Sequence, residues 1–157
     1  METVYIETSV VSYLTARPSR DLVVAAHQQI THEWWDNVLF KKYEPCISEE
    51  VVREASCGDF HAADLRLSAM VNLKVLPLSD ETTRLAEAYS RVLNLSASAK
   101  ADAVHLAASV LNSMDYLVSW NCRHIANGHV IKLIQAENQK RGLVTPVICT
   151  PEELLEN

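Results

Sequence analysis

The sequence predicts an α/β fold, in which a short, mostly parallel central sheet of about five strands lies between two layers of helices. Short apolar runs rich in β-branched residues alternate along the chain with longer stretches of helical period. The chain has 157 residues, of which 48% are hydrophobic and 22% charged, and these values are typical of globular proteins. A chain of this length removes roughly 70% of its unfolded surface from water when it folds. We therefore expect a single domain over residues 1–157, with one core and no need of disulfides.

Five short apolar runs are the predicted strands. Tyr116–Trp120 is the clearest of them, because its apolar and aromatic residues are bounded by polar positions. The strands are predicted, in chain order, at residues 3–6, 45–47, 73–76, 116–120 and 147–149. In a doubly wound sheet the first and the fourth of these strands are neighbours.

Stretches of helical period separate the strands. The helices are predicted at residues 9–14, 21–42, 49–55, 60–70, 80–93, 100–111 and 129–141, followed by a helical turn from Pro151. Ser48, Asp80 and Ser98 are the expected N-terminal caps, and Gly142 is a suitable residue after a helix end. The stretch 100–111 is alanine-rich and apolar on most faces, which indicates a helix buried against the sheet.

The longest predicted helix carries adjacent tryptophans. Trp34 continues an apolar stripe of four-residue spacing, which predicts that it packs in the core. Trp35 falls at the edge of that stripe, where an exposed ring would mark a surface for a partner.

Composition excludes several classes of function. The net charge of -6 speaks against binding of nucleic acid through a broad basic face, although a bound metal ion can reverse the charge locally. The four cysteines form no C-x-x-C pair and the six histidines no H-x-x-x-H pair, so no zinc site is predicted. Three scattered glycines exclude the glycine-rich phosphate loops.

The chain also lacks the signals of membrane insertion and export. No uncharged stretch reaches the roughly 18 residues that a membrane span requires, and Glu2 stands where a signal peptide has positive charge. We therefore expect a cytoplasmic protein with reduced thiols.

Polar residues follow the first and the fourth predicted strands. In open α/β sheets, ligands bind beyond the carboxyl ends of the strands. Glu7 and Ser9 come after the first strand, and Ser119 and Asn121 come at the end of the fourth. Because these strands are expected to be neighbours, the two groups should face one crevice. Asn121 can alternatively be a cap of the turn after its strand.

Two further carboxylates can reach this crevice from helices. Asp102 lies near the start of the apolar helix 100–111, and Glu54 lies on the helix 49–55. Glu50, one turn before Glu54, is a rival candidate, and both can alternatively belong to a solvated helix face. Converging carboxylates repel one another, and a hard cation with oxygen ligands relieves the repulsion. Mg²⁺, with Mn²⁺ as a substitute, is therefore the expected metal. His105, one turn beyond Asp102, is interpreted as a core or supporting residue.

Four segments, in order, match a known pattern. A strand leads into an acid followed by Thr-Ser, a second acid comes six residues after a serine, a third acid follows Lys-x, and a strand runs into Ser-x-Asn. The matching residues are Glu7-Thr8-Ser9, Ser48 with Glu54, Lys100-Ala101-Asp102-Ala103 and Ser119-Trp120-Asn121. With this pattern the chain resembles the PIN-domain nucleases, in particular the VapC-like toxins of bacterial toxin–antitoxin pairs.

The resemblance implies a fold, an activity and partners. The fold would be a PIN-like α/β/α domain, and the activity metal-dependent hydrolysis of RNA phosphodiester bonds inside the chain. Glu7, Asp102 and Asn121 would hold Mg²⁺, and Glu54 would complete the catalytic set by acting on the attacking water. Ser9 and Ser119 would support these groups. The expected partners are an RNA substrate, a small antitoxin and a second copy of the chain.

Two positions depart from the family pattern. Glu7 stands where the family usually has Asp, and Asn121 stands where many members have Asp, with His124 nearby in place of a further acid. These departures keep a second hypothesis open, namely a non-catalytic PIN-like module that binds RNA or protein and has a degenerate metal site. A third possibility, a flavodoxin-like signalling domain, lacks its usual paired acids after the first strand.

Overall fold

A parallel five-stranded sheet forms the centre of the molecule. The computed structural model describes residues 1–155. Its strands are β1 (Glu2–Ile6), β2 (Tyr43–Ser48), β3 (Lys74–Leu76), β4 (Tyr116–Val118) and β5 (Val147–Cys149). They are ordered β3-β2-β1-β4-β5, and every neighbouring pair is parallel. The predicted pairing of the first and fourth strands is confirmed, with Tyr5 opposite Leu117.

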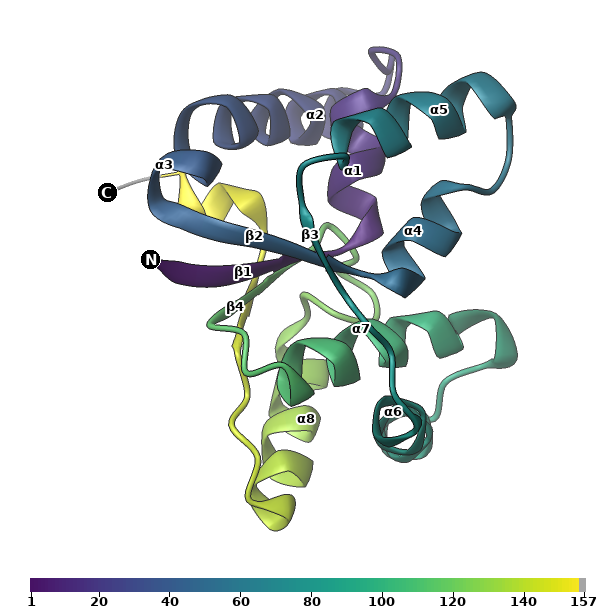
Figure 1. Ribbon diagram of the computed structural model, residues 1–157, viewed down its shortest axis with the longest axis vertical. Helices are drawn as coiled ribbons and strands as arrows, with labels where there is room; N and C mark the ends of the chain where they lie inside the picture. The colour runs from purple at the N-terminus through teal and green to yellow at the C-terminus, as the bar shows by residue number, and fades with distance from the viewer. Residues whose placement is uncertain (156–157) are drawn as a thin grey trace.

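Helices cover both faces of this sheet. They are α1 (Thr8–Thr15), α2 (Leu22–Trp34), α3 (Phe40–Lys42), α4 (Glu49–Ala55), α5 (Phe60–Ala69), α6 (Asp80–Val92), α7 (Lys100–Leu111) and α8 (Gly128–Arg141), with short turns η1 (Trp35–Leu39), η2 (Ala97–Ala99) and η3 (Pro151–Leu154). Figure 1 shows α1, α2 and α5 on one side of the sheet and α6, α7 and α8 on the other. The predicted three-layer α/β/α class is therefore confirmed.

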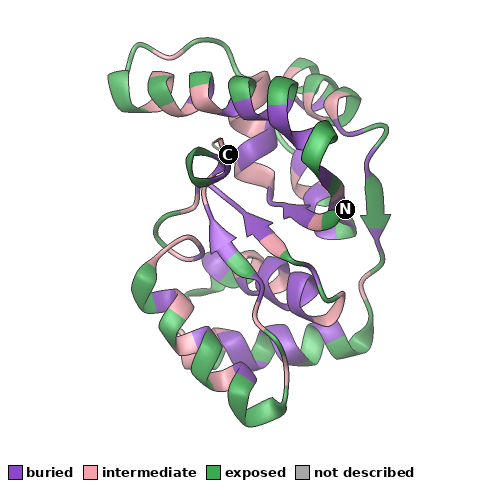
Figure 2. Ribbon diagram, turned by 90° about the vertical axis from the view of Figure 1, so that its left-hand side faces the viewer, coloured by how far each residue is buried: buried purple, intermediate pink, exposed green. Residues whose placement is uncertain are grey.

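The core follows the apolar pattern of the sequence. Buried residues line the strands and the inward faces of the helices, while the outward faces are exposed (Figure 2). The alanine-rich helix α7 is buried along most of its length, as predicted. Its small residues let it approach the sheet closely, because an alanine adds little volume between a helix and a strand.

The long helix predicted over residues 21–42 is confirmed as a continuous helical stretch, but it is not α-helical throughout. After α2 the backbone widens into the π-helical turn η1 and then the short α3, and β2 begins at Tyr43, two residues earlier than expected. A π-helical turn contains about one more residue than an α-helical turn. The residues after it therefore lie on a different face of the helix than regular α-helical spacing predicts. Trp34 and Trp35 are consequently both buried, and the expected exposed Trp35 is not found.

Three caps also differ from the sequence prediction. Ser79, not Asp80, caps α6, and its hydroxyl accepts a hydrogen bond from the Thr82 amide at 3.2 Å. The turn η2 covers Ser98, so that α7 starts after Ala99. Ser48 precedes α4 as expected, but its side chain makes no capping bond there. Gly142 does end α8, with a φ of 68° that favours glycine.

None of the helices in residues 1–155 combines the length and the apolar character that a membrane crossing demands.

Candidate functional site

The ends of β1 and β4 meet at one edge of the sheet. The Glu7 amide donates to the Val118 carbonyl at 3.0 Å, immediately after the two strands stop pairing. The polar residues that follow the strands therefore lie side by side, as the strand order predicted.

Glu7 is a buried carboxylate at the start of α1. Its side chain is only 4% exposed, and one carboxylate oxygen accepts a hydrogen bond from the Ser9 amide at 2.6 Å. Within residues 1–155 nothing donates to the other oxygen. Burial raises the pKa of Glu7, although the charge of His105 and the Ser9 hydrogen bonds oppose this shift. The site thus contains an acid whose negative charge is only partly compensated.

Ser9 and Ser119 join the two strand ends to each other. The Ser9 hydroxyl accepts from the Trp120 amide at 2.9 Å, and the Ser119 hydroxyl accepts from the Asn121 amide at 2.9 Å. The two hydroxyl oxygens are 3.4 Å apart. Both hydroxyls hold the backbone of the two loops, and the Ser9 side chain also forms a hydrogen bond that acts to lower the pKa of Glu7.

Glu54 reaches the site from α4. One of its carboxylate oxygens accepts a hydrogen bond from the Thr8 hydroxyl at 2.7 Å and lies 2.5 Å from Nε2 of His105. Burial acts to raise the pKa of Glu54, but the hydrogen bond and charge of His105, together with Thr8, outweigh it and the pKa is lowered. The rival Glu50 instead binds the guanidinium of Arg53 on the same helix.

His105 connects Glu54 to a buried chain of polar groups. Its Nδ1 lies 2.7 Å from the Tyr5 hydroxyl, which in turn lies 2.7 Å from the Ser48 hydroxyl. The histidine is 1% exposed. Burial acts to lower the pKa of His105, yet its hydrogen bond to Glu54 and the charges of Glu7 and Glu54 raise it. His105 and Glu54 therefore form a buried ion pair.

Asp102 and Asn121 form a second group around His124. Nδ1 of His124 lies 2.9 Å from a carboxylate oxygen of Asp102. The side-chain oxygen of Asn121 accepts from the His124 amide at 3.0 Å, so Asn121 caps the turn after β4. This is the alternative that the sequence left open for Asn121.

The sequence interpretation missed the two histidine contacts. His105 follows Asp102 by three residues and so shares a helix face with it, and Tyr5 alternates with Glu7 along β1. These spacings predict that His105 lies on the same helix face as Asp102 and that Tyr5 points to the same side as Glu7. They give no indication that the histidines pair with the acids, because the partners come from different elements.

The donor atoms suit Mg²⁺ in type, since carboxylate and amide oxygens are its usual protein ligands. Glu7, Glu54 and Asp102 each keep one oxygen without a donor from residues 1–155. Within the same residues, however, no three His, Cys, Asp or Glu side chains are grouped so that they hold a metal ion. The metal ligands Glu7, Asp102 and Asn121 therefore stay a prediction.

The chain shares its fold with a chain in a solved structure. No protein-family model matches the sequence, and no curated protein matches it either. A chain in the crystal structure of VapBC2 from Rickettsia felis, bound to a DNA fragment from their promoter, superimposes with a TM-score of 0.55. The likeness covers 94% of this chain and 98% of that chain at 12% sequence identity. It supports a PIN-like α/β/α fold of the VapC kind.

Proposed function

We propose that the protein is a metal-dependent endoribonuclease that hydrolyses RNA phosphodiester bonds, as the toxin of a toxin–antitoxin pair. The observation that carries the proposal is the buried Glu7 carboxylate beside Glu54 at the carboxyl edge of the sheet, where α/β folds bind ligands. A buried, partly compensated acid destabilises a fold, which indicates a functional role. The PIN-like fold agrees with this function but does not decide it.

Each acid has a distinct role in this proposal. Glu7, Asp102 and Asn121 would hold Mg²⁺, with Mn²⁺ as a substitute. A bound ion supplies positive charge that stabilises the phosphate as it is attacked. Glu54 stays ionised at neutral pH because its pKa is lowered, and its free oxygen accepts a proton from the attacking water. His105 and Thr8 fix the orientation of that carboxylate.

A non-catalytic PIN-like binding module is the second candidate. The observation that favours it is the pairing of Glu54 and Asp102 with histidines, which occupy oxygens that a metal ion would otherwise bind. The two candidates differ in whether RNA is cleaved.

The test is cleavage of a mixed set of single-stranded RNAs, with Asp102→Asn as the variant and Asp64→Asn as the control. Asp64 is exposed on α5, so its substitution repeats the change in charge at a distant surface. We expect Mg²⁺ or Mn²⁺ to support cleavage, EDTA to stop it, and Asp102→Asn to lower the rate by about 100-fold or more. No cleavage with either metal on any of the RNAs would favour the binding module.

The proposed partners are a small antitoxin and a second copy of this chain, both in the cytoplasm. Co-expression of the gene next to this one should relieve growth inhibition by the toxin, and light scattering of the purified protein should give the mass of a dimer.

A further inference from the structure

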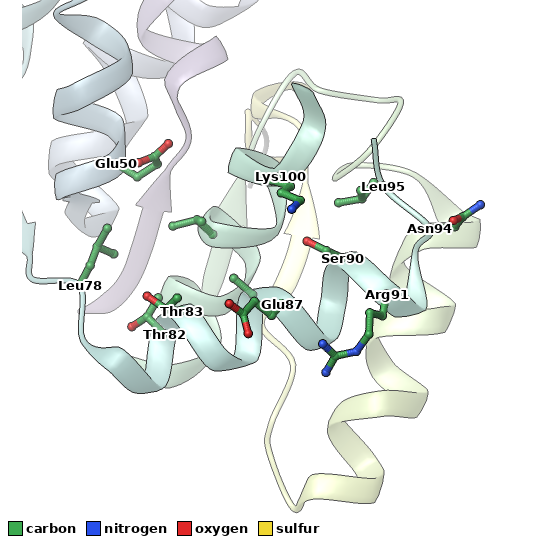
Figure 3. A pocket seen from close by; sticks show the side chains of 12 residues that line it. Glu50, Leu78, Thr82, Thr83, Glu87, Ser90, Arg91, Asn94, Leu95 and Lys100 are labelled. Carbon is green, nitrogen blue, oxygen red and sulfur yellow. The ribbon is translucent and has the colours of Figure 1, made fainter. Parts of the chain in front are cut away.

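A cavity of about 760 Å³ lies between α6 and α7, within the range of roughly 300–1,000 Å³ that is typical of ligand sites. Figure 3 shows Glu50 and Leu78 on one side of it, Lys100 above it and the outer face of α6 below. The cavity is therefore a groove bounded by three helices, not a gap at a single loop.

This cavity begins next to the candidate site. Glu50 on its wall lies one helical turn, about 6 Å, from Glu54 along α4. Lys100 on its rim is two residues before Asp102 on α7. The cavity and the candidate site therefore share the helices α4 and α7.

The cavity combines free charges with an apolar floor. Lys100, Arg91 and Glu87 are exposed and have no hydrogen-bond or ion-pair partner in residues 1–155. Glu50 is neutralised by Arg53. The apolar side chains of the lining are Leu78, Ala86, Leu95 and Val104.

We propose that this cavity binds one nucleotide of single-stranded RNA beside the phosphodiester that is cleaved, an inference that rests on the proposed nuclease function. Lys100, the cation nearest to the candidate site, pairs with a phosphate, and Arg91 pairs with the next one along the strand. An unstacked base lies on Ala86 and Val104, and Glu87 accepts a hydrogen bond from an N–H group of its edge.

A nucleotide fits these observations better than a protein segment does. An amphipathic helix of a partner needs a long apolar groove with anchors at several turns. The apolar side chains here come from separate elements and are flanked by two unpaired cations, Lys100 and Arg91, which complement phosphates.

The experiment measures RNA cleavage and RNA binding by Lys100→Gln and Ala86→Trp, with Lys140→Gln as the control. Lys140 is exposed on α8 and lies outside the cavity. In cleavage with Mg²⁺ we expect each cavity variant to raise KM by about tenfold and to leave kcat within about twofold, because one charged contact or the base position is lost. The control should match the wild type.

A second measurement separates a phosphate contact from a general change in affinity. With Ca²⁺ in place of Mg²⁺, the affinity for a fluorescent single-stranded RNA is measured over a range of salt concentrations. The slope of log K against log salt is negative, and Lys100→Gln should make it shallower by about 0.7. This is the value for one phosphate contact on a single strand.

The outcomes are distinct. If the wild type cleaves RNA, both cavity variants keep its KM and Lys100→Gln keeps its salt slope, the proposed nucleotide subsite is wrong. The cavity would then be a candidate site for a protein segment. If the wild type neither cleaves nor binds RNA, the proposed function itself is wrong.

Discussion

Two carboxylate–histidine pairs lie at the same edge of the sheet but differ in their surroundings. In the first pair His105 is 1% exposed and Glu54 28%, whereas in the second His124 is 28% exposed and Asp102 16%. His105 also bonds Tyr5, which bonds Ser48, so three elements hold the ring. No second side chain in residues 1–155 holds the His124 ring, which lies on the turn after β4.

The difference in burial between His105 and His124 implies different roles for the two carboxylate–histidine pairs. Removing one partner of a fully buried ion pair costs about 3–5 kcal/mol, while a surface pair contributes about 0–1 kcal/mol. The pair of the buried His105 lies nearer the first value than the pair of the half-buried His124 does. Glu54 is therefore fixed in place, with one oxygen held by His105 and Thr8. Asp102 can leave His124 at little cost, so it is the acid that is able to turn toward a cation.

The largest predicted effect is that of a substitution that breaks the pair of His105 and Glu54. His105→Ala should lower the free energy of unfolding by about 3 kcal/mol, because Glu54 loses its cationic partner and keeps only the Thr8 hydroxyl, while the Tyr5 hydroxyl keeps only Ser48. His124→Ala, the matched variant of the exposed pair, should lower it by less than about 1 kcal/mol. Urea denaturation measures both. Equal losses would show that the two pairs do not differ in energy.

A smaller effect concerns the pH dependence of the buried pair. The pKa of His105 is raised above its ordinary 6.5, so its contribution to stability is complete below that value and is lost as the pH rises through the folded pKa. The pKa of Glu54 is lowered below its ordinary 4.5, so its contribution is complete above that value and is lost as the pH falls through the folded pKa. Both contributions are therefore present between 4.5 and 6.5.

The difference in unfolding free energy between the wild type and His105→Gln should consequently be largest in this window and should decrease on both sides of it. Denaturation at a series of pH values measures the difference. His61→Gln is the control, because His61 is exposed on α5 and has no partner in residues 1–155. A difference that is independent of pH would mean that His105 and Glu54 are not an ion pair.

The sequence predicted the sheet and the polar residues at the meeting ends of two strands because both depend on local patterns. Apolar runs mark the strands, and polar residues such as Glu7 and Asn121 directly follow two of them. The histidine pairs were not predictable in this way. His105 and Glu54 are far apart in the sequence, and their contact depends on how α4 and α7 pack against the sheet. Ser48 shows the same limit, since a residue suited to capping α4 bonds Tyr5 instead.

The smallest predicted effect concerns Glu7, the one acid of the three that contacts no histidine. Its pKa is raised mainly by burial, so the folded state favours its neutral form, and the cost of its charge grows as the pH rises through the folded pKa. Glu7→Gln removes the charge and keeps an oxygen to accept from the Ser9 amide. In EDTA at neutral pH, this variant should therefore gain about 1 kcal/mol in the free energy of unfolding. Glu54→Gln, which loses its attraction to His105, should instead lose stability in the same denaturation assay. A loss for Glu7→Gln as well would show that the Glu7 charge is fully compensated in the folded protein, and the argument that places a cation beside it would fail.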